Sequence, residues 1–176
     1  MRCEMTEGEG IVFRRPNGAG VKIDSVALAR MLEFQQRETH QQEAGGVLLG
    51  RHILGCSDIV IDEVTSPMPG DLRKPLAFHR GQSHHQQVID ERWRSSEGTC
   101  LYLGEWHTHP ESYPVPSRID LGDWFRRLHT DHFDGESLFF IIVGTREVRA
   151  WEGFRQPREI VQLLYSHQEK MRDGAM

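Results

Sequence analysis

Two histidines separated by one residue stand in the stretch from Glu105 to Asp120, which reads EWHTHPESYPVPSRID. Side chains alternate along a strand, so His107 and His109 at the end of a strand are expected on the same face. This spacing suits two nitrogen ligands at about 2.0–2.1 Å from zinc, and Asp120, after a loop stiffened by prolines, can add a carboxylate oxygen. Three protein ligands leave the fourth position for water, which is typical of a catalytic zinc.

A metal ion held in this way would supply the chemistry of hydrolysis. It lowers the pKa of bound water from about 15.7 to about 7 and polarises a carbonyl oxygen. A carboxylate that is not a ligand can carry the proton, and a nearby hydroxyl can donate to the oxyanion. Two simpler interpretations stay open: the histidines could be buried and hydrogen-bonded, and Ser117-x-x-Asp120 could be only a helix capping box. The H-x-H pair, Pro110 and the S-x-x-D pattern occur in one short stretch, and this combination favours the metal site.

Periodicity and turn residues predict the elements around this stretch. Residues 101–107 form the strand that carries the histidines, and Ser117 opens a helix with an apolar face. A buried strand over 138–143 continues across a turn at Gly144 into a strand over 147–151. The apolar face of the helix consists of Leu121, Trp124, Phe125 and Leu128.

Strands and helices are also predicted to alternate in the rest of the chain. A hairpin over 11–23 turns at Asn17–Gly18, and a helix capped by Asp24 runs to about His40, with Leu28, Met31 and Leu32 on one side. The remaining expected elements are strands over 47–50 and 59–64, a loop over 66–82 with a short strand at 76–78, a helix opened by the capping box Ser83–Gln86, and a helix over 157–171 that starts at Pro157.

Composition bounds the class of protein. The 176 residues carry 21 Lys and Arg against 26 Asp and Glu, a formal net charge of −5. This length predicts a single domain over 1–176 with a loose polar leader over 1–10. No run of about 20 apolar residues predicts a membrane span, and the acidic balance argues against nucleic-acid binding. Three cysteines without a C-x-x-C pair indicate a cytoplasmic protein. The elements predict an α/β (α+β) fold, a mixed β-sheet flanked by about three helices.

Residues 107–120 match a known signature. The sequence resembles the JAMM (JAB/MPN) metalloprotease family, whose motif is an upstream Glu followed by H-[ST]-H-P-x6-S-x-x-D, and every defined position of the second part is present. The upstream Glu falls on Glu43, which precedes the small and apolar run AGGVLLG. The resemblance covers about residues 24–152 and implies the JAMM/MPN fold, which is similar to that of cytidine deaminases.

The resemblance implies a role for each matching residue. It implies one Zn²⁺ per chain, bound by His107, His109 and Asp120. Glu43 would take the proton of the zinc-activated water as a general base and pass it to the leaving amine as a general acid. Ser117 would hydrogen-bond the oxyanion. The implied reaction is hydrolysis of the amide or isopeptide bond after the C-terminus of a ubiquitin-like modifier.

A narrower likeness concerns Phe78–Arg80, Ile89–Glu91 and Tyr102–Pro110. These segments resemble stand-alone bacterial JAB peptidases found beside ubiquitin-like conjugation enzymes, notably in CBASS anti-phage operons. There the peptidase removes a cGAS-like nucleotidyltransferase from targets to which an E1–E2 fusion attached it. The implied partners are the extended C-terminal tail of a ubiquitin-like modifier or of such a nucleotidyltransferase conjugate, and an E1–E2-type enzyme of the same pathway.

The chain also departs from the larger relatives. Deubiquitinating members often carry a long second insertion after the Asp, whereas Asp120 and the strand at Leu138 are separated here by only 17 residues without a cysteine. Residues 66–98 occupy the place of the first insertion and are the candidate wall of a groove for the substrate tail, which a strand there could bind by β-augmentation. An ordinary surface loop and helix is the alternative. Residues 153–176 form a C-terminal extension without an assigned role.

Most of the other residues considered are expected to have structural roles. Glu105 is expected on the face of His107, where it could orient an imidazole or compete with Glu43 as proton carrier; the motif favours Glu43. Thr108 is expected to face the other way, and Trp106 to lie in the core. The remaining expectations are solvated positions for His79, His84 and His85, a helix end at His129 and His132, and small buried side chains for Cys56 and Cys100.

Three other functions would account for part of these sequence features. A non-catalytic MPN scaffold usually lacks the metal ligands that this chain has. A JAB peptidase that processes a ubiquitin-like or sulfur-carrier protein would share the zinc machinery and differ only in the groove. A DNA-repair factor of the RadC type conflicts with the negative net charge.

Overall fold

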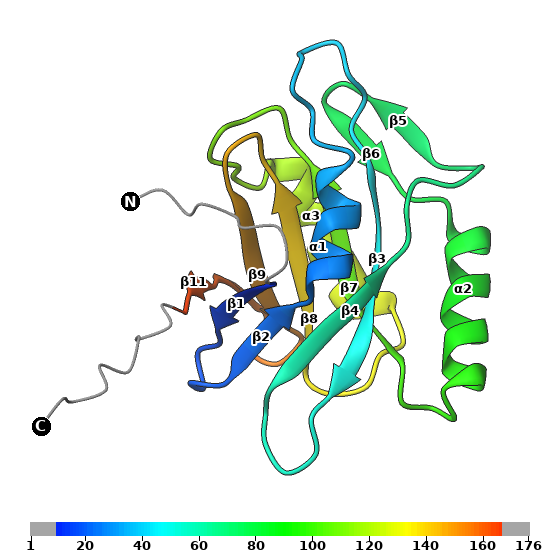
Figure 1. Ribbon diagram of the computed structural model, residues 1–176, viewed down its shortest axis with the longest axis vertical. Coiled ribbons are helices and arrows are strands. Elements are labelled where there is room, and N and C mark those ends of the chain that lie inside the picture. The colour runs from blue at the N-terminus through cyan, green and yellow to red at the C-terminus, as the bar shows by residue number, and fades with distance from the viewer. Residues whose placement is uncertain (1–9, 167–176) are drawn as a thin grey trace, which may run out of the picture.

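The computed structural model describes residues 10–166, which form one large sheet, a small hairpin and three helices (Figure 1). The predicted mixed sheet with about three helices is confirmed, whereas residues 1–9 of the leader predicted over 1–10, and residues 167–176, lie outside the described residues. In chain order the elements are β1 Ile11–Arg14, β2 Gly20–Ile23, α1 Ser25–Leu32, β3 Gly45–His52, β4 Ile59–Val64, β5 Leu72–Lys74, β6 Ala77–His79, α2 Gln82–Ser95, β7 Leu101–Thr108, α3 Arg118–Thr130, β8 Ser137–Val143, β9 Val148–Phe154, β10 Glu159–Gln162 and β11 Leu164–Tyr165.

The large sheet has nine strands in the order β10-β9-β8-β7-β3-β4-β2-β1-β11. The edge strands β10 and β11 are separated in the chain by the single residue Leu163, so the sheet curves and its two ends approach each other. An ion pair of 2.6 Å between Arg15, which follows β1, and the buried Glu152 on β9 connects the same two ends.

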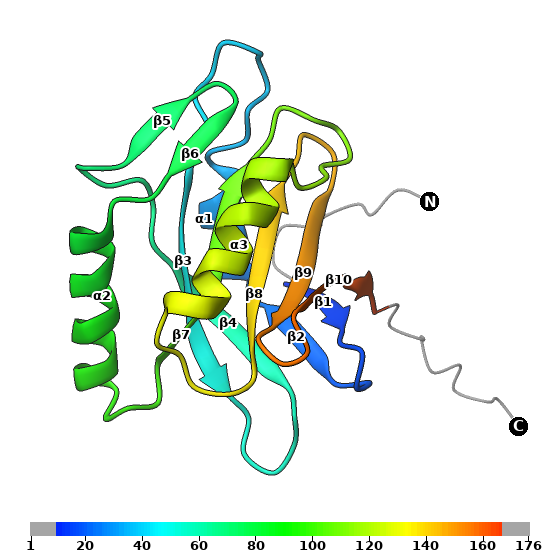
Figure 2. The ribbon, with the colours of Figure 1, turned by 180° about the vertical axis from the view of Figure 1, so that it is seen from behind.

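Helices cover both faces of the sheet. Figure 1 shows α1 in front of the sheet, and Figure 2, from behind, shows α3 in front with α2 beside it. Two apolar cores result, one under α1 and one under α3, because a helix buries one apolar stripe against a sheet. The first includes Ala27, Leu28, Met31, Leu48, Leu103, Trp106 and Phe139, and the second includes Val47, Leu49, Tyr102, Trp124, Leu128 and Phe140. Within the described residues, no helix is both long and apolar enough to cross a membrane.

A bulge in β7 decides which core each of its side chains faces. In the pairing with β3, Leu48 lies opposite Gly104 and Leu49 opposite Tyr102, so Leu103 has no opposite residue. Leu103 and Trp106 therefore face the same core although three positions separate them. Strict alternation from Leu103 would have placed residue 107 in the core under α1. The bulge instead turns it toward α3.

Three predictions about helices are wrong. The helix that begins after Asp24 ends at Leu32 and not near His40, because the following residues have no apolar face. Gln36 is instead buried, and its side chain donates to the carbonyls of Gln41 and Pro75.

The N-cap residue of α2 is Gly81, which makes no side-chain hydrogen bond. Ser83 therefore lies inside the helix, and the predicted capping box does not form.

The predicted helix over 157–171 is absent from its described part, which forms β10 and β11. The short apolar run from Ile160 to Leu164 fits a helix and a strand equally well by pattern, and pairing with the free edges of β9 and β1 decides for strands. Both strands belong to the large sheet. The loop over 66–82 also contains more strand than expected, namely the hairpin of β5 and β6.

The bulge predicts a position at which alanine is not tolerated. Gly104 has φ +142°, and a Cβ added there would lie 1.8 Å from the carbonyl oxygen of Phe139. Gly104→Ala is therefore expected to lower the free energy of unfolding by at least about 2 kcal/mol. The matched control is Gly122→Ala in α3, where an added Cβ meets nothing within 4 Å and the helix gains up to about 1 kcal/mol. Urea unfolding of both variants measures the difference, and equal stabilities would contradict the steric account.

Candidate metal centre

The two histidines lie at the end of β7, where neighbouring strands fix the backbone. His107 lies opposite Gly45 of β3 and beside Ile142 of β8, and the His109 amide donates to the carbonyl of Val143 over 3.0 Å. Their Nε2 atoms are 3.0 Å apart, as expected for side chains on one face. Thr108 faces the other way, as predicted, and its hydroxyl accepts the Ala44 amide.

Asp120 reaches the histidines from the first turn of α3. Its carboxylate oxygens lie 3.3 Å from the Nε2 atoms of His107 and His109, one oxygen for each ring. The same carboxylate accepts the Ser117 amide over 2.6 Å, and the Ser117 hydroxyl accepts the Asp120 amide over 3.1 Å. The capping box is therefore present, and it orients the carboxylate toward the imidazoles. The capping interpretation of this motif is therefore confirmed, and a role of Asp120 as a metal ligand stays a prediction that this geometry permits.

Glu43 enters the site from the segment that precedes β3. Its Oε1 lies 3.9 Å from His109 Nε2, and the residue is 4% exposed. The β5–β6 hairpin holds its backbone, because the Glu43 amide donates to the Lys74 carbonyl and the Arg73 side chain donates to the Glu43 carbonyl, both over 2.8 Å. Residues 66–98 therefore position the Glu43 carboxylate, and they also line the cleft beside the two histidines.

The electrostatics of the site come from carboxylates crowded around two imidazoles. Burial raises the pKa of Glu43 to about 8, His109 opposes this, and Asp120 and Glu111 add to it. Burial alone would raise the pKa of Asp120, but contacts with the two imidazoles and the Ser117 amide hold it well below its usual range. For His109, burial lowers the pKa, and the contact with Asp120 and the charges of Glu43 and Glu111 outweigh it and raise the pKa. The causes therefore differ: burial dominates at Glu43, whereas the contact between Asp120 and the imidazoles lowers the pKa of the carboxyl group and raises that of His109.

The three donor side chains fit a divalent metal ion. Two ring nitrogens and a carboxylate oxygen from His107, His109 and Asp120 all lie within 4.8 Å of one another. Donors bound at about 2.0–2.1 Å in a tetrahedron lie about 3.3–3.4 Å apart. The two imidazole nitrogens are 3.0 Å apart, and each lies 3.3 Å from a different oxygen of Asp120. Imidazole nitrogen with one carboxylate is a donor set that zinc accepts.

Glu105 has other partners than the imidazoles. Its Oε1 accepts from Arg80 over 2.8 Å and lies 3.0 Å from Arg127 Nε. Asp131 lies 3.8 Å from Arg80 and accepts the hydroxyl of Tyr102 over 2.8 Å. These groups form a half-buried cluster between the metal donors and the end of α3, and we call it the arginine cluster.

Several expectations about single residues change. His85 is completely buried and not solvated: its Nδ1 lies 2.7 Å from the Thr65 hydroxyl and its Nε2 3.0 Å from Asp71. These bonds fasten α2 to β4 and to the loop before β5, and a helical position flanked by polar residues gave no sign of them. Cys56 is exposed and not buried, whereas Cys100 is buried as predicted, and both are free thiols.

The sequence did not single out Glu111. Its carboxylate lies 3.6 Å from His109 Nδ1 and accepts the amide of Val115, so it stands behind the ring that faces the metal donors with Nε2. A carboxylate in this place favours the tautomer with a proton on Nδ1 and leaves Nε2 free to bind a metal. Its position directly after the H-T-H-P motif was the available signal.

A curved mixed sheet, three helices and a His-His-Asp cluster with a buried glutamate define a class of metal-dependent hydrolases, and comparison with known families agrees. Residues 25–153 match the family described as prokaryotic homologs of the JAB domain. The chain belongs to this family and is a hydrolase of the JAMM type.

Two similar relatives carry more specific names. The chain is 34% identical over 151 residues to a CD-NTase/cGAS isopeptidase of Vibrio cholerae, covering 86% of this chain and 91% of the relative. It is 32% identical over 143 residues to an Escherichia coli protein of the same name, covering 81% and 86%. A solved structure, the protein DSY2949 from Desulfitobacterium hafniense, shares the fold with a TM-score of 0.55 at 20% identity, over 84% of this chain and 90% of that one.

The donor set predicts what removal of one ligand does. Asp120→Ala is expected to purify with less than about a tenth of the wild-type zinc content, because two imidazoles alone hold the ion weakly. The matched control is Asp123→Ala, one turn further along α3, which should retain the ion. Elemental analysis of both proteins gives the metal-to-chain ratio, expected to be one zinc in the wild type. Unchanged zinc in Asp120→Ala would show that the ligand set is wrong.

Proposed function

We propose that this protein is a zinc-dependent isopeptidase that cleaves the amide bond after the C-terminus of a conjugated protein. The observation that carries the proposal is the convergence of His107, His109 and Asp120 beside the buried carboxylate of Glu43 in a chain of the JAB family. When bound, zinc lowers the pKa of a water ligand to about 7 and polarises the scissile carbonyl. The chain acts as one metallopeptidase domain over residues 1–176 in this proposal.

Glu43 moves the proton. Its carboxylate takes a proton from the attacking water as the water oxygen bonds to the carbonyl carbon, and it delivers that proton to the leaving amine nitrogen as the C–N bond breaks. Burial supports this role, because the pKa of about 8 lies near neutral pH, where a group can both accept and return a proton. A cation at the donors would lower this pKa and favour the base form for the first step.

Ser117 stabilises the oxyanion in this proposal. Its hydroxyl oxygen already accepts the Asp120 amide, which leaves the hydroxyl proton available to donate to an oxygen above α3. The residue is exposed at the helix N-terminus, where a substrate can reach it. The site can therefore bind, position and cleave an amide without a covalent intermediate.

The substrate we propose is a CD-NTase conjugate. The relatives in Vibrio cholerae and Escherichia coli are named CD-NTase/cGAS isopeptidases and align with more than four-fifths of this chain. In this proposal the protein removes a cGAS-like nucleotidyltransferase that an E1–E2-type enzyme has attached to a target, in the cytoplasm and as part of anti-phage defence. In the described part of the chain β6 pairs only with β5, and its residues Phe78 and His79 line the cleft, so in this proposal its other edge pairs with the extended tail of the substrate.

The alternatives receive less support. A non-catalytic scaffold leaves the complete donor set and the buried Glu43 without a purpose. Processing of a ubiquitin-like or sulfur-carrier protein uses the same chemistry, and only the tail that enters the cleft distinguishes it from the lead proposal. A panel of C-terminal fusions with CD-NTase, ubiquitin-like and sulfur-carrier tails decides between them, since cleavage of the CD-NTase fusion alone is expected.

Glu43→Gln tests the proton carrier. The variant keeps the shape of the side chain, so fold and zinc content are expected to match the wild type. Turnover of the CD-NTase fusion is expected to fall by about 10²–10⁴-fold, because the amide cannot accept the proton. Steady-state kinetics with parallel metal analysis measures both. Wild-type turnover would transfer the role to another carboxylate, with Glu105 the next to test by the same substitution.

Ser117 can be tested for two roles at once. Ser117→Ala removes both the cap and the hydroxyl and is expected to cost about 1 kcal/mol of stability, whereas Ser117→Gly costs only a few tenths. Loss of an oxyanion donor lowers kcat by about 10²–10³-fold in both variants. Thermal unfolding and kcat are measured side by side. A kcat that stays near the wild type in Ser117→Gly would leave Ser117 as a helix cap alone.

A further inference from the structure

A cavity outside the catalytic cleft lies between α3 and the turn from β9 to β10. It encloses about 390 Å³, which falls in the range of about 300–1,000 Å³ typical of small-molecule sites. Figure 2 shows α3 in front of the sheet with this turn beside it. Both segments contribute to the lining, which includes Phe125, Arg126, His129, Phe154, Arg155 and Arg158. Of the lining residues, only Arg126 also borders the cleft beside the metal donors.

Positive charge is concentrated in this lining, although the whole chain carries a formal net charge of −5. Arg126, Arg155 and Arg158 contribute guanidinium groups and His129 an imidazole, and none of the acidic side chains that the structure describes lines the cavity. Asp123 pairs with Arg126 over 2.7 Å, whereas the other two arginines have no carboxylate partner in the described part of the chain. Two guanidinium groups therefore lack a counter-charge, which an anionic ligand would supply.

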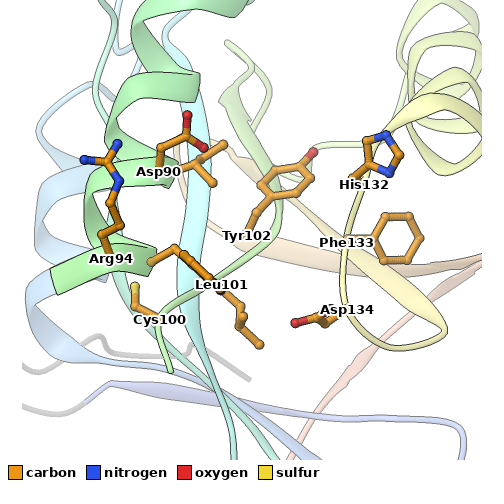
Figure 3. Close-up of a pocket in the computed structure, with 10 residues that line it drawn as sticks. Asp90, Arg94, Cys100, Leu101, Tyr102, His132, Phe133 and Asp134 are labelled. Atoms are coloured by element: carbon orange, nitrogen blue, oxygen red, sulfur yellow. The ribbon is translucent and has the colours of Figure 1, made fainter. Parts of the chain in front are cut away.

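Arg155 is held by contacts that leave part of its guanidinium group free. Its Nε donates to the Leu128 carbonyl over 2.6 Å, and its Nη2 donates to the Asp131 carbonyl over 3.1 Å. The group also lies 4.5 Å from the centroid of the Phe133 ring, which Figure 3 shows on the loop that follows α3. These bonds compensate the partial negative charge at the C-terminal end of α3, which would otherwise repel an anion. Nη1 stays available as a donor.

Arg158 and two phenylalanines form the part of the cavity that suits a planar group. The guanidinium carbon of Arg158 lies 4.4 Å from the centroid of the Phe125 ring, and among the described residues this guanidinium group has no hydrogen bond and no ion pair. Phe154 adds a second half-buried ring to the lining, and Leu128 adds a buried apolar side chain. Planar bases stack on aromatic rings and on guanidinium planes.

We propose that this cavity binds a nucleoside phosphate, with the phosphate at the free donors of Arg155 and Arg158 and the base against the aromatic lining. The planar fork of a guanidinium group matches phosphate oxygens in pairs. An inorganic anion would leave the apolar part of the lining in water, and an uncharged ligand would leave two cations without a counter-charge. A nucleoside phosphate satisfies both parts. The proposal concerns a site outside the catalytic cleft and does not rest on the proposed function.

Calorimetric titration of the zinc-loaded wild type tests the class of ligand. The probes are AMP, GMP, CMP and UMP, with adenosine and inorganic phosphate as the two halves of the ligand. At least one nucleotide is expected to bind about tenfold or more tightly than either half, because only the nucleotide engages both parts of the cavity. If none of the four nucleotides binds more tightly than inorganic phosphate, the proposal is overturned.

Arg158→Ala tests the location of the site. The residue is exposed in a turn and has no hydrogen bond in the described structure, so the fold is expected to persist. The dissociation constant of the nucleotide is expected to rise by about tenfold or more, and Arg158→Lys, which keeps the charge but loses the planar fork, should lie between this variant and the wild type.

The matched control is Arg146→Ala, which removes the same charge from an exposed turn at the opposite end of β9 and should leave the affinity unchanged. An equal loss of affinity in Arg146→Ala and Arg158→Ala would show attraction by net charge alone and overturn the site. A second control is Asp120→Ala, which removes a metal donor and should bind the nucleotide as the wild type does. Loss of nucleotide binding in that variant would place the phosphate on the metal instead of in this cavity.

Discussion

The contact between the Asp120 carboxylate and two imidazole rings is the interaction on which the site depends. The same carboxylate closes the capping box at the start of α3, so the helix cannot move away from β7 without losing both its cap and its contacts with His107 and His109. Helix stability and donor geometry are thus coupled through one side chain. Burial of this carboxylate beside Glu43 would be unfavourable in isolation, and the imidazoles or a bound cation compensate for it.

The scaffold around this contact is regular apart from register shifts in the strand pairing, one of which lies in β7. The neighbouring strands β3 and β8, the Arg15–Glu152 pair and two apolar cores hold β7 on both sides. Within that frame, the bulge at Leu103 changes the face to which β7 directs its later side chains. Bulges beside active sites commonly re-aim a side chain in this way, and the absence of a Cβ at Gly104 makes this one possible.

Residues 66–98 connect Glu43 to the cleft beside the donors. Arg73 and Lys74 hold the backbone of Glu43, and β6 borders the cleft. His85 fastens α2 to Thr65 and Asp71 from beneath, with no exposed surface of its own. A displacement of this segment would therefore change the position of Glu43 and the lining of the cleft together.

The sequence by itself determined the elements with strong local signals and the chemistry of the donor set. The strand over 101–107, the helix that Ser117 opens and the hairpin at Asn17–Gly18 follow from alternation, capping and turn preferences, which act within a few residues. The motif from His107 to Asp120 predicted three donors that the structure brings together, while Glu43 came only from the resemblance.

Tertiary structure alone decided the rest, because those outcomes depend on contacts between distant residues. The run over 160–164 became strands because two sheet edges were free to pair with it, and His85 was buried because Thr65 and Asp71 supply both of its hydrogen bonds. The arginine cluster around Glu105 likewise joins segments far apart in the chain. No pattern within a short window carries that information.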